Sequence, residues 1–143
     1  MEYAHNEGKD WRVPMQQWLE DELRCEVFNP NKESERFLQK HCTGENFRQL
    51  KTSDLPRYQE LVSKIVDLDC REIAERSDFV ICFWDESAMR GAGTKGELTI
   101  AKYFGKPVYL VTLMQSHEIP GWVLGCTTRM FLSFDELKLF LRQ

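Results

Sequence analysis

The chain has 143 residues, of which 42% are hydrophobic and 29% are charged, enough for one domain with a full apolar core. Its formal net charge of −4 argues against partners such as nucleic-acid polymers or anionic membranes, which bind basic surfaces. No apolar run is long enough to cross a membrane, and no signal-peptide core is present. We therefore expect a single cytoplasmic domain over residues 1–143.

Cysteine and histidine spacing gives no metal signature. The five cysteines are an odd number and lack CxxC spacing. His41 abuts Cys42, but no second pair at ligand spacing exists. We therefore expect no zinc site and no other cofactor.

The first part of the chain predicts a helix, a strand and a polar insertion. Apolar residues at helical spacing indicate a helix over 12–23, with Pro14 near its first turn. Residues 25–28 are a candidate strand, which ends at Asn29-Pro30 because proline cannot donate to a strand ladder. The polar stretch 31–56 predicts a loop-rich insertion over one sheet edge, with a short helix at 33–40.

A long helix is predicted from Ser53-Asp54 to about Arg76. At about 100° per residue its apolar side chains centre near Asp69, whereas Asp67 points to the opposite side. A carboxylate on an apolar helix face is costly unless it is paired or used. Asp69 is therefore a candidate functional residue, with a bond to a neighbouring loop as the structural alternative.

The second half of the chain predicts a βαβ unit. Residues 79–84 and 107–112 are continuous apolar runs typical of strands buried on both faces, and a helix of about 95–104 lies between them. This order implies a parallel sheet with a right-handed crossover. Residues 129–132 are a possible last strand, and 134–141 an amphipathic C-terminal helix. The fold class is therefore α/β.

The loop 85–94 follows the first of these strands, where ligands bind in parallel α/β sheets. Gly91 and Gly93 allow backbone N–H groups to approach a ligand, and the loop delivers Glu97 into the first turn of the next helix. Thr94 and Glu97 also match a capping box, which is the structural alternative for Glu97. Asp85 is either a turn residue or a second functional carboxylate.

An ordered set of segments resembles the nucleoside 2-deoxyribosyltransferases: Glu26–Pro30 after a helix, Asp69 on a helix ending Glu75-Arg76-Ser77-Asp78, Phe79–Asp85, Gly93-Thr94-x-x-Glu97 and Gly105–Val108. The resemblance implies a flavodoxin-like three-layer sandwich with a parallel sheet of about four to five strands. It implies cleavage of an N-glycosidic bond, with transfer of the 2-deoxyribosyl group to another base or to water. The implied partners are a small-molecule nucleoside or nucleotide and further copies of the chain in a homo-oligomer.

The resemblance also assigns roles to residues. The family's nucleophilic glutamate falls on Glu97, and its helix aspartate falls on or next to Asp69. Asp69 or Asp85 would manage the proton on the base. The implied substrate-binding residues are Asn29, Ser87, Gly91, Gly93 and Thr94.

Two departures from the family pattern matter. The family begins with a strand and a glycine-containing loop, and here the chain starts at Met1-Glu2-Tyr3-Ala4, so we expect the first strand to be missing or truncated. Relatives also carry aspartate or serine at the position of Gly91. The resemblance therefore leaves open whether the substrate is a nucleoside or a nucleotide.

Two other functions fit the sequence. One is a non-catalytic module that binds a nucleotide-derived ligand. The other is a phosphoribohydrolase of the cytokinin-activating type, whose GxGTxxE pattern matches residues 91–97. The short chain and the early segment ending at Asn29-Pro30 argue against the latter.

Overall fold

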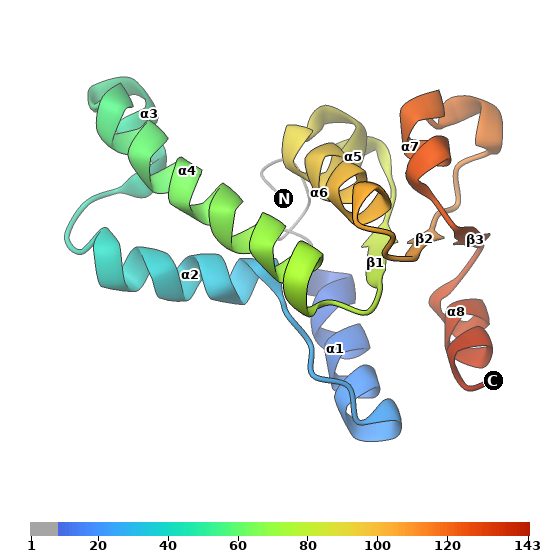
Figure 1. Ribbon diagram of the computed structural model, residues 1–143. Coiled ribbons are helices and arrows are strands. Elements are labelled where there is room, and N and C mark those ends of the chain that lie inside the picture. Colours follow the sequence, from blue (N-terminus) through green and yellow to red (C-terminus); the bar gives the residue numbers. More distant parts are fainter. Residues whose placement is uncertain (1–8) are drawn as a thin grey trace.

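The computed structural model describes residues 9–143, which form helices around a small sheet (Figure 1). The elements in chain order are α1 (Lys9–Leu23), α2 (Pro30–His41), α3 (Phe47–Ser53), α4 (Leu55–Arg71), the π-helical turn η2 (Glu72–Arg76), β1 (Val80–Phe83), α5 (Glu86–Arg90), α6 (Ala92–Tyr103), β2 (Val108–Val111), the 3₁₀ turn η3 (Ser116–Glu118), α7 (Gly121–Cys126), β3 (Arg129–Phe131) and α8 (Phe134–Leu141).

The sheet is parallel, as the sequence predicts. Its order is β1-β2-β3, with Val80 opposite Val108 and Tyr109 opposite Arg129. β1, α6 and β2 form the predicted βαβ unit, and β3 and α8 lie at the predicted positions. Within residues 9–143 the sheet has three strands, fewer than the four to five that the family resemblance implies.

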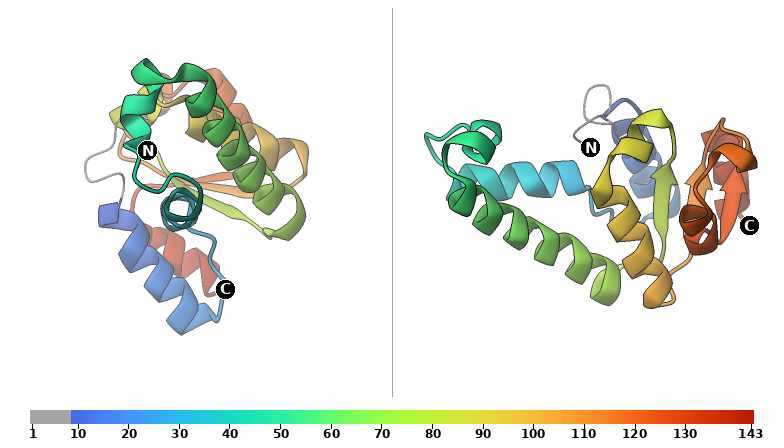
Figure 2. Two further views of the ribbon diagram at one scale, coloured as in Figure 1. Left: turned by 90° about the vertical axis from the view of Figure 1, so that its left-hand side faces the viewer. Right: turned by 90° about the horizontal axis from the view of Figure 1, so that it is seen from above.

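Helices cover both faces of this sheet, because alternate strand residues point into two separate cores. Figure 2 shows α1 and α8 on one side of the sheet and α4 and α6 on the other. The core beneath α1 and α8 contains Met15, Leu19, Val111, Phe131 and Leu137. The opposite core, beneath η2, α6 and α7, contains Ile73, Cys82, Trp84, Ala88, Leu98, Ala101, Val108, Leu110, Ile119, Val123 and Cys126.

The predicted strand at residues 25–28 is wrong, since this segment has no regular secondary structure. A strand needs a neighbour to complete its backbone hydrogen bonds. The nearest candidate is β1, the edge strand on this side of the sheet in the described chain. Both segments line one cavity, and no strand pairing joins them.

The helix α1 begins three residues before the predicted start, so that Pro14 lies in its second turn. A proline there removes one helical hydrogen bond. Burial of Met15 and Leu19 against the sheet offsets that loss.

The long predicted helix is confirmed. The side chain of Asp54 caps α4 by accepting a hydrogen bond from the Arg57 backbone N–H at 3.2 Å, and Pro56 lies in the first turn. α4 continues into η2, which ends at Arg76. Asp69 lines the cavity whereas Asp67 is exposed, as the apolar stripe predicts.

The expected loop-rich insertion at 31–56 is wrong, because most of this stretch is helical. α2 and α3 pack on α4 around the buried residues Cys42, Leu50 and Leu61. We call residues 30–64 the helical arm, which extends from the β1 side of the molecule (Figure 1). The short helix predicted at 33–40 is confirmed as part of α2, which has no fully buried side chain.

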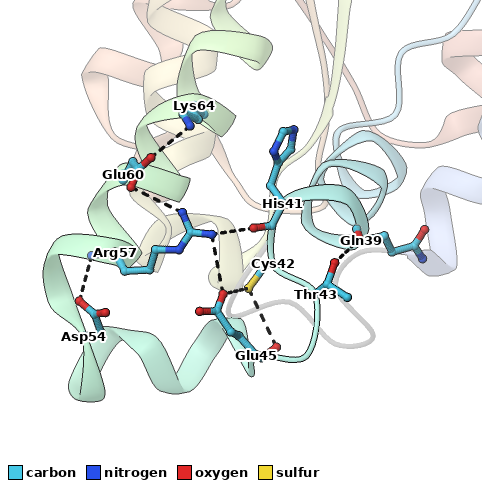
Figure 3. A network of polar contacts seen from close by, with 9 residues as sticks. All are labelled: Gln39, His41, Cys42, Thr43, Glu45, Asp54, Arg57, Glu60 and Lys64. Carbon is cyan, nitrogen blue, oxygen red and sulfur yellow. Dashed lines mark hydrogen bonds and ion pairs between the residues drawn. The ribbon is translucent and has the colours of Figure 1, made fainter.

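A polar network holds the arm together (Figure 3). Arg57 donates a hydrogen bond through Nη2 to the backbone oxygen of His41 at 2.7 Å. Its guanidinium lies 3.8 Å from the Glu45 carboxylate and 3.5 Å from that of Glu60. Arg57 therefore ties the end of α2 and the following loop to α4.

Candidate active site

A cavity of about 520 Å³ lies beside β1, which is an edge strand of the sheet within residues 9–143. Its walls come from α1, residues 23–30, the end of α4, η2 and β1, together with Glu97 of α6. A second cavity of about 30 Å³ shares Trp11, Arg12 and Glu97 with the larger one. The larger volume suits a small organic ligand.

Glu97 reaches this cavity from the middle of α6. Gly91 is the N-cap of α6 and no side chain caps this helix, so Glu97 is the sixth helical residue. The alternative in which Thr94 and Glu97 form a capping box is therefore wrong. The prediction that Glu97 lies in the first turn of the helix is also wrong. The pKa of Glu97 is raised to about 7, chiefly by burial and also by the charge of Asp69, whereas the charge of Arg12 opposes the shift.

Asp69 enters the same cavity from the end of α4. Burial raises the pKa of its carboxyl group to about 6. The fold thus brings two carboxyl groups from different helices to one cavity, where both hold protons more tightly than in water. Because the charge of Asp69 acts on Glu97, the two groups titrate as a pair.

Arg12 is a site residue that the sequence reasoning missed. It lines both cavities from the first half of α1. Burial lowers the pKa of its guanidinium and the charge of Glu97 raises it, so the two groups interact. The signal was present, since Arg12 precedes Met15 and Leu19 at helical spacing and so lies on the apolar side of α1.

Of the implied substrate-binding residues, two line a cavity. Asn29 is 6% exposed and lines the larger one, where its Oδ1 accepts from the Asn31 N–H and its Nδ2 donates to Gln16, each at 3.1 Å. Thr94 lines the smaller one beside Glu97. Gly91 and Gly93 form the start of α6 and line neither cavity.

Asp85 and Ser87 lie apart from the carboxyl pair and serve α5. Asp85 is the N-cap of α5, and its Oδ1 accepts hydrogen bonds from the Ala88 N–H at 3.0 Å and the Ser87 hydroxyl at 2.6 Å. Neither side chain lines either cavity. This placement matches the turn-residue alternative for Asp85 and leaves Asp69 as the second carboxyl group of the site.

The arrangement is suited to acid, base and nucleophilic chemistry by carboxyl groups. Titratable groups with raised pKa values that share a cavity are typical of catalytic sites. Among residues 9–143, no cluster of three or more histidine, cysteine or acidic side chains is placed to hold a metal ion.

Comparison of the chain with protein-family models, with curated proteins and with solved structures finds no match. Within the part of the chain that the structure describes, no helix combines the length and apolar character needed to cross a membrane.

Proposed function

We propose that this chain is a nucleoside 2-deoxyribosyltransferase-like enzyme that cleaves or transfers the N-glycosidic bond of a nucleoside or nucleotide through Glu97. The observation that carries the proposal is the meeting of Glu97 and Asp69 in one cavity of ligand size, with raised pKa values of about 7 and about 6. A parallel sheet with helices on both faces supports the flavodoxin-like sandwich of this proposal. A homo-oligomer also belongs to it.

In the first step the Glu97 carboxylate attacks the anomeric carbon, and a glycosyl ester forms as the bond to the base nitrogen breaks. The bond electrons leave with the base, which takes a proton from Asp69. The transition state has oxocarbenium character that the negative charge of Glu97 stabilises. Asp69 raises the rate because a neutral base is a better leaving group than an anion.

In the second step water or an acceptor base attacks the same carbon and releases the Glu97 carboxylate. Asp69, now ionised, takes the proton from the attacking group. Each step inverts the anomeric carbon, so the product retains the configuration of the substrate.

The reaction requires one proton on the carboxyl pair. With pKa values of about 6 and about 7, the pair holds a single proton between these two pH values. The productive form has this proton on Asp69 and Glu97 ionised, and it is the minor of the two singly protonated forms because Glu97 has the higher pKa. We therefore expect kcat/KM to follow a bell-shaped pH profile with limbs near 6 and 7.

The proposal is tested by chromatographic detection of free base after incubation with deoxynucleosides, ribonucleosides and their monophosphates, each with and without an acceptor base. Wild type is expected to release base from at least one substrate class, and Glu97→Ala to reduce the rate by 10³-fold or more, on the order of other nucleophile losses. Glu86, exposed on α5 and absent from both cavities, offers Glu86→Gln as the matched control. Ligand-induced thermal stabilisation without base release would favour the non-catalytic binding module instead.

Asp69→Asn separates the acid from the nucleophile. It is expected to slow base release by about 10²-fold or more, with a smaller effect on substrates whose base leaves readily without protonation. An equal effect on good and poor leaving groups would contradict the acid role of Asp69.

A further inference from the structure

We infer that the larger cavity selects an unphosphorylated nucleoside over the corresponding nucleoside monophosphate, and that Glu26 is a specificity-determining residue at its entrance. The inference rests on the proposed function, since it names the substrate class of the same site. Its basis is the set of charged residues that line the cavity and the ion pairs between them.

Carboxyl groups outnumber guanidinium groups among the residues that line this cavity. Within residues 9–143 the arginines of the lining are Arg12, Arg24 and Arg76. The acidic residues of the lining are Glu26, Asp69, Glu72, Asp78 and Glu97. Even when Asp69 and Glu97 share one proton, the lining keeps an excess of negative charge. Sites that bind phosphate have the opposite balance, with arginine, lysine or free backbone N–H groups around the anion.

The charged residues at the entrance of the cavity are the solvent-exposed members of its lining, Arg24, Glu26, Arg76 and Asp78. Arg76 of η2 lies 3.3 Å from the carboxylate of Glu26 and 3.7 Å from that of Glu72. Glu26 belongs to the opposite wall, formed by residues 23–30, so this ion pair joins two walls of the cavity. The guanidinium of Arg76 is thereby neutralised by two carboxylates.

The other two arginines also have carboxyl groups near them. The Arg12 guanidinium carbon lies 4.6 Å from the centroid of the Trp11 ring, and Arg12 lines the smaller cavity together with Glu97. A phosphate held by Arg12 would therefore lie close to the Glu97 carboxyl group. Arg24 lines the entrance with the carboxylates of Glu26 and Asp78.

The N-terminus of α2 also reaches the cavity, where a helix can attract an anion. Pro30, its first residue, has no N–H group. The next N–H group, that of Asn31, donates to the Asn29 side chain at 3.1 Å. The start of this helix is therefore capped from within the chain.

A phosphate on the substrate would meet this excess of carboxylates, whereas the neutral sugar of a nucleoside does not. Repulsion of the wrong ligand is a common source of specificity. Glu26 contributes to it in two ways, because its carboxylate adds negative charge and also neutralises Arg76. The side chains of Glu26 and Arg76 are 90% and 62% exposed, so salt should screen this effect.

The test compares kcat/KM for base release from nucleosides, both deoxy and ribo, and from their monophosphates, in wild type and in Glu26→Gln. Glu22→Gln is the matched control, because Glu22 is exposed near the end of α1 and lines neither cavity. Each substrate is measured at low and at high ionic strength. Dissociation constants of the same compounds are measured by calorimetry, so that binding is followed separately from base release.

Wild type is expected to favour the nucleoside by about tenfold or more at low salt, as like charges in a binding site oppose each other. The preference should shrink at high salt. In Glu26→Gln it should fall by about three- to fivefold through a lower KM for the monophosphate, the range of an exposed charge interaction. The nucleoside rate should stay unchanged, and Glu22→Gln should resemble wild type.

A wild-type preference for the monophosphate, or an unchanged preference in folded Glu26→Gln, overturns the inference. Tighter binding of the nucleoside in a protein that never releases base keeps the inferred selectivity and overturns the proposed function. If neither kind of compound binds, both are overturned.

Discussion

At the scale of single residues, the site holds two carboxyl groups in a buried environment, where their ionised forms are less stable than in water. Burial disfavours the charged forms of Glu97 and Asp69, so ionising them in the folded protein costs free energy that the unfolded chain does not expend. The free energy of unfolding should therefore depend on pH through these two groups.

Glu97→Gln is expected to stabilise the protein at alkaline pH. The pKa of Glu97 rises from 4.5 to about 7 on folding, so the folded state binds more protons and wild type loses stability as pH increases through this range. The neutral glutamine avoids the loss. We expect the free energy of unfolding of Glu97→Gln to exceed that of wild type by about 1–3 kcal/mol at pH 8, with the gap closing near pH 4. Urea denaturation at the two pH values measures it, and a pH-independent gap would contradict the buried-carboxyl account.

The candidate site was only partly predictable from sequence. The sequence indicates Asp69 because a carboxylate is unusual on the apolar face of a helix. Its place on that face also predicts that its side chain points inward, and in the structure it lines the cavity. Arg12 fits the same criterion, but its partner Glu97 lies 85 residues away along the chain and is identified only by the fold. Asp85 and Ser87 follow a strand where ligands bind, yet local hydrogen bonds occupy them, and spacing along the chain does not show this.

At the scale of elements, the junction between α1 and α2 depends on Asn29. This buried side chain caps α2 and also donates to Gln16 of α1, so it joins two helices at the cavity wall. Asn46 caps α3 in the same way, through the Gln49 N–H at 3.3 Å, but it is exposed.

Replacing each asparagine by alanine separates capping from burial. Asn46→Ala should lose about 1 kcal/mol of unfolding free energy, the ordinary value of a cap. Asn29→Ala should lose about 2–3 kcal/mol, because it also leaves the Oε1 atom of Gln16 without its donor at a partly buried position. Chemical denaturation measures both. Equal losses would show that the link to α1 contributes nothing.

The elements themselves were predicted best where burial is strong. β1, β2 and α4 carry long apolar patterns, and their positions were correct to within a few residues. Residues 25–28 have the composition of a strand but form no strand in the structure. A strand requires hydrogen bonds to a neighbouring strand, and the composition of a segment does not show whether it has such a neighbour. The sequence predicts the middle of α2 but misses its ends and all of α3, because these helices form from caps and polar residues with little burial.

At the scale of the whole molecule, the chain has a sheet with two cores and a helical arm with a smaller core of its own. α4 belongs to both parts, since its first half packs in the arm (Figure 1). Its last turn carries Asp69, which lines the cavity. Elements with few buried contacts open locally before the rest of a protein unfolds.

Arg57→Ala is expected to loosen the arm alone. The variant removes the hydrogen bond to His41 and the contacts with Glu45 and Glu60, so backbone amides of α2 and α3 should exchange with deuterium several-fold faster. Amides of β1 and β2 should keep their protection. Lys64→Ala, which removes an exposed pair with Glu60 only, is the control. Equal acceleration in the sheet would show that the arm and the sheet unfold as one unit.

Intact-protein mass spectrometry of acid-quenched turnover tests whether Glu97 forms a covalent bond to the sugar. With the substrate that releases base, wild type is predicted to gain the mass of one glycosyl group, mapped by peptide analysis to residue 97. Glu97→Gln is predicted to gain nothing, and Glu86→Gln to behave as wild type. Base release by Glu97→Gln at the wild-type rate, or an adduct mapped to another residue, would exclude Glu97 as the nucleophile.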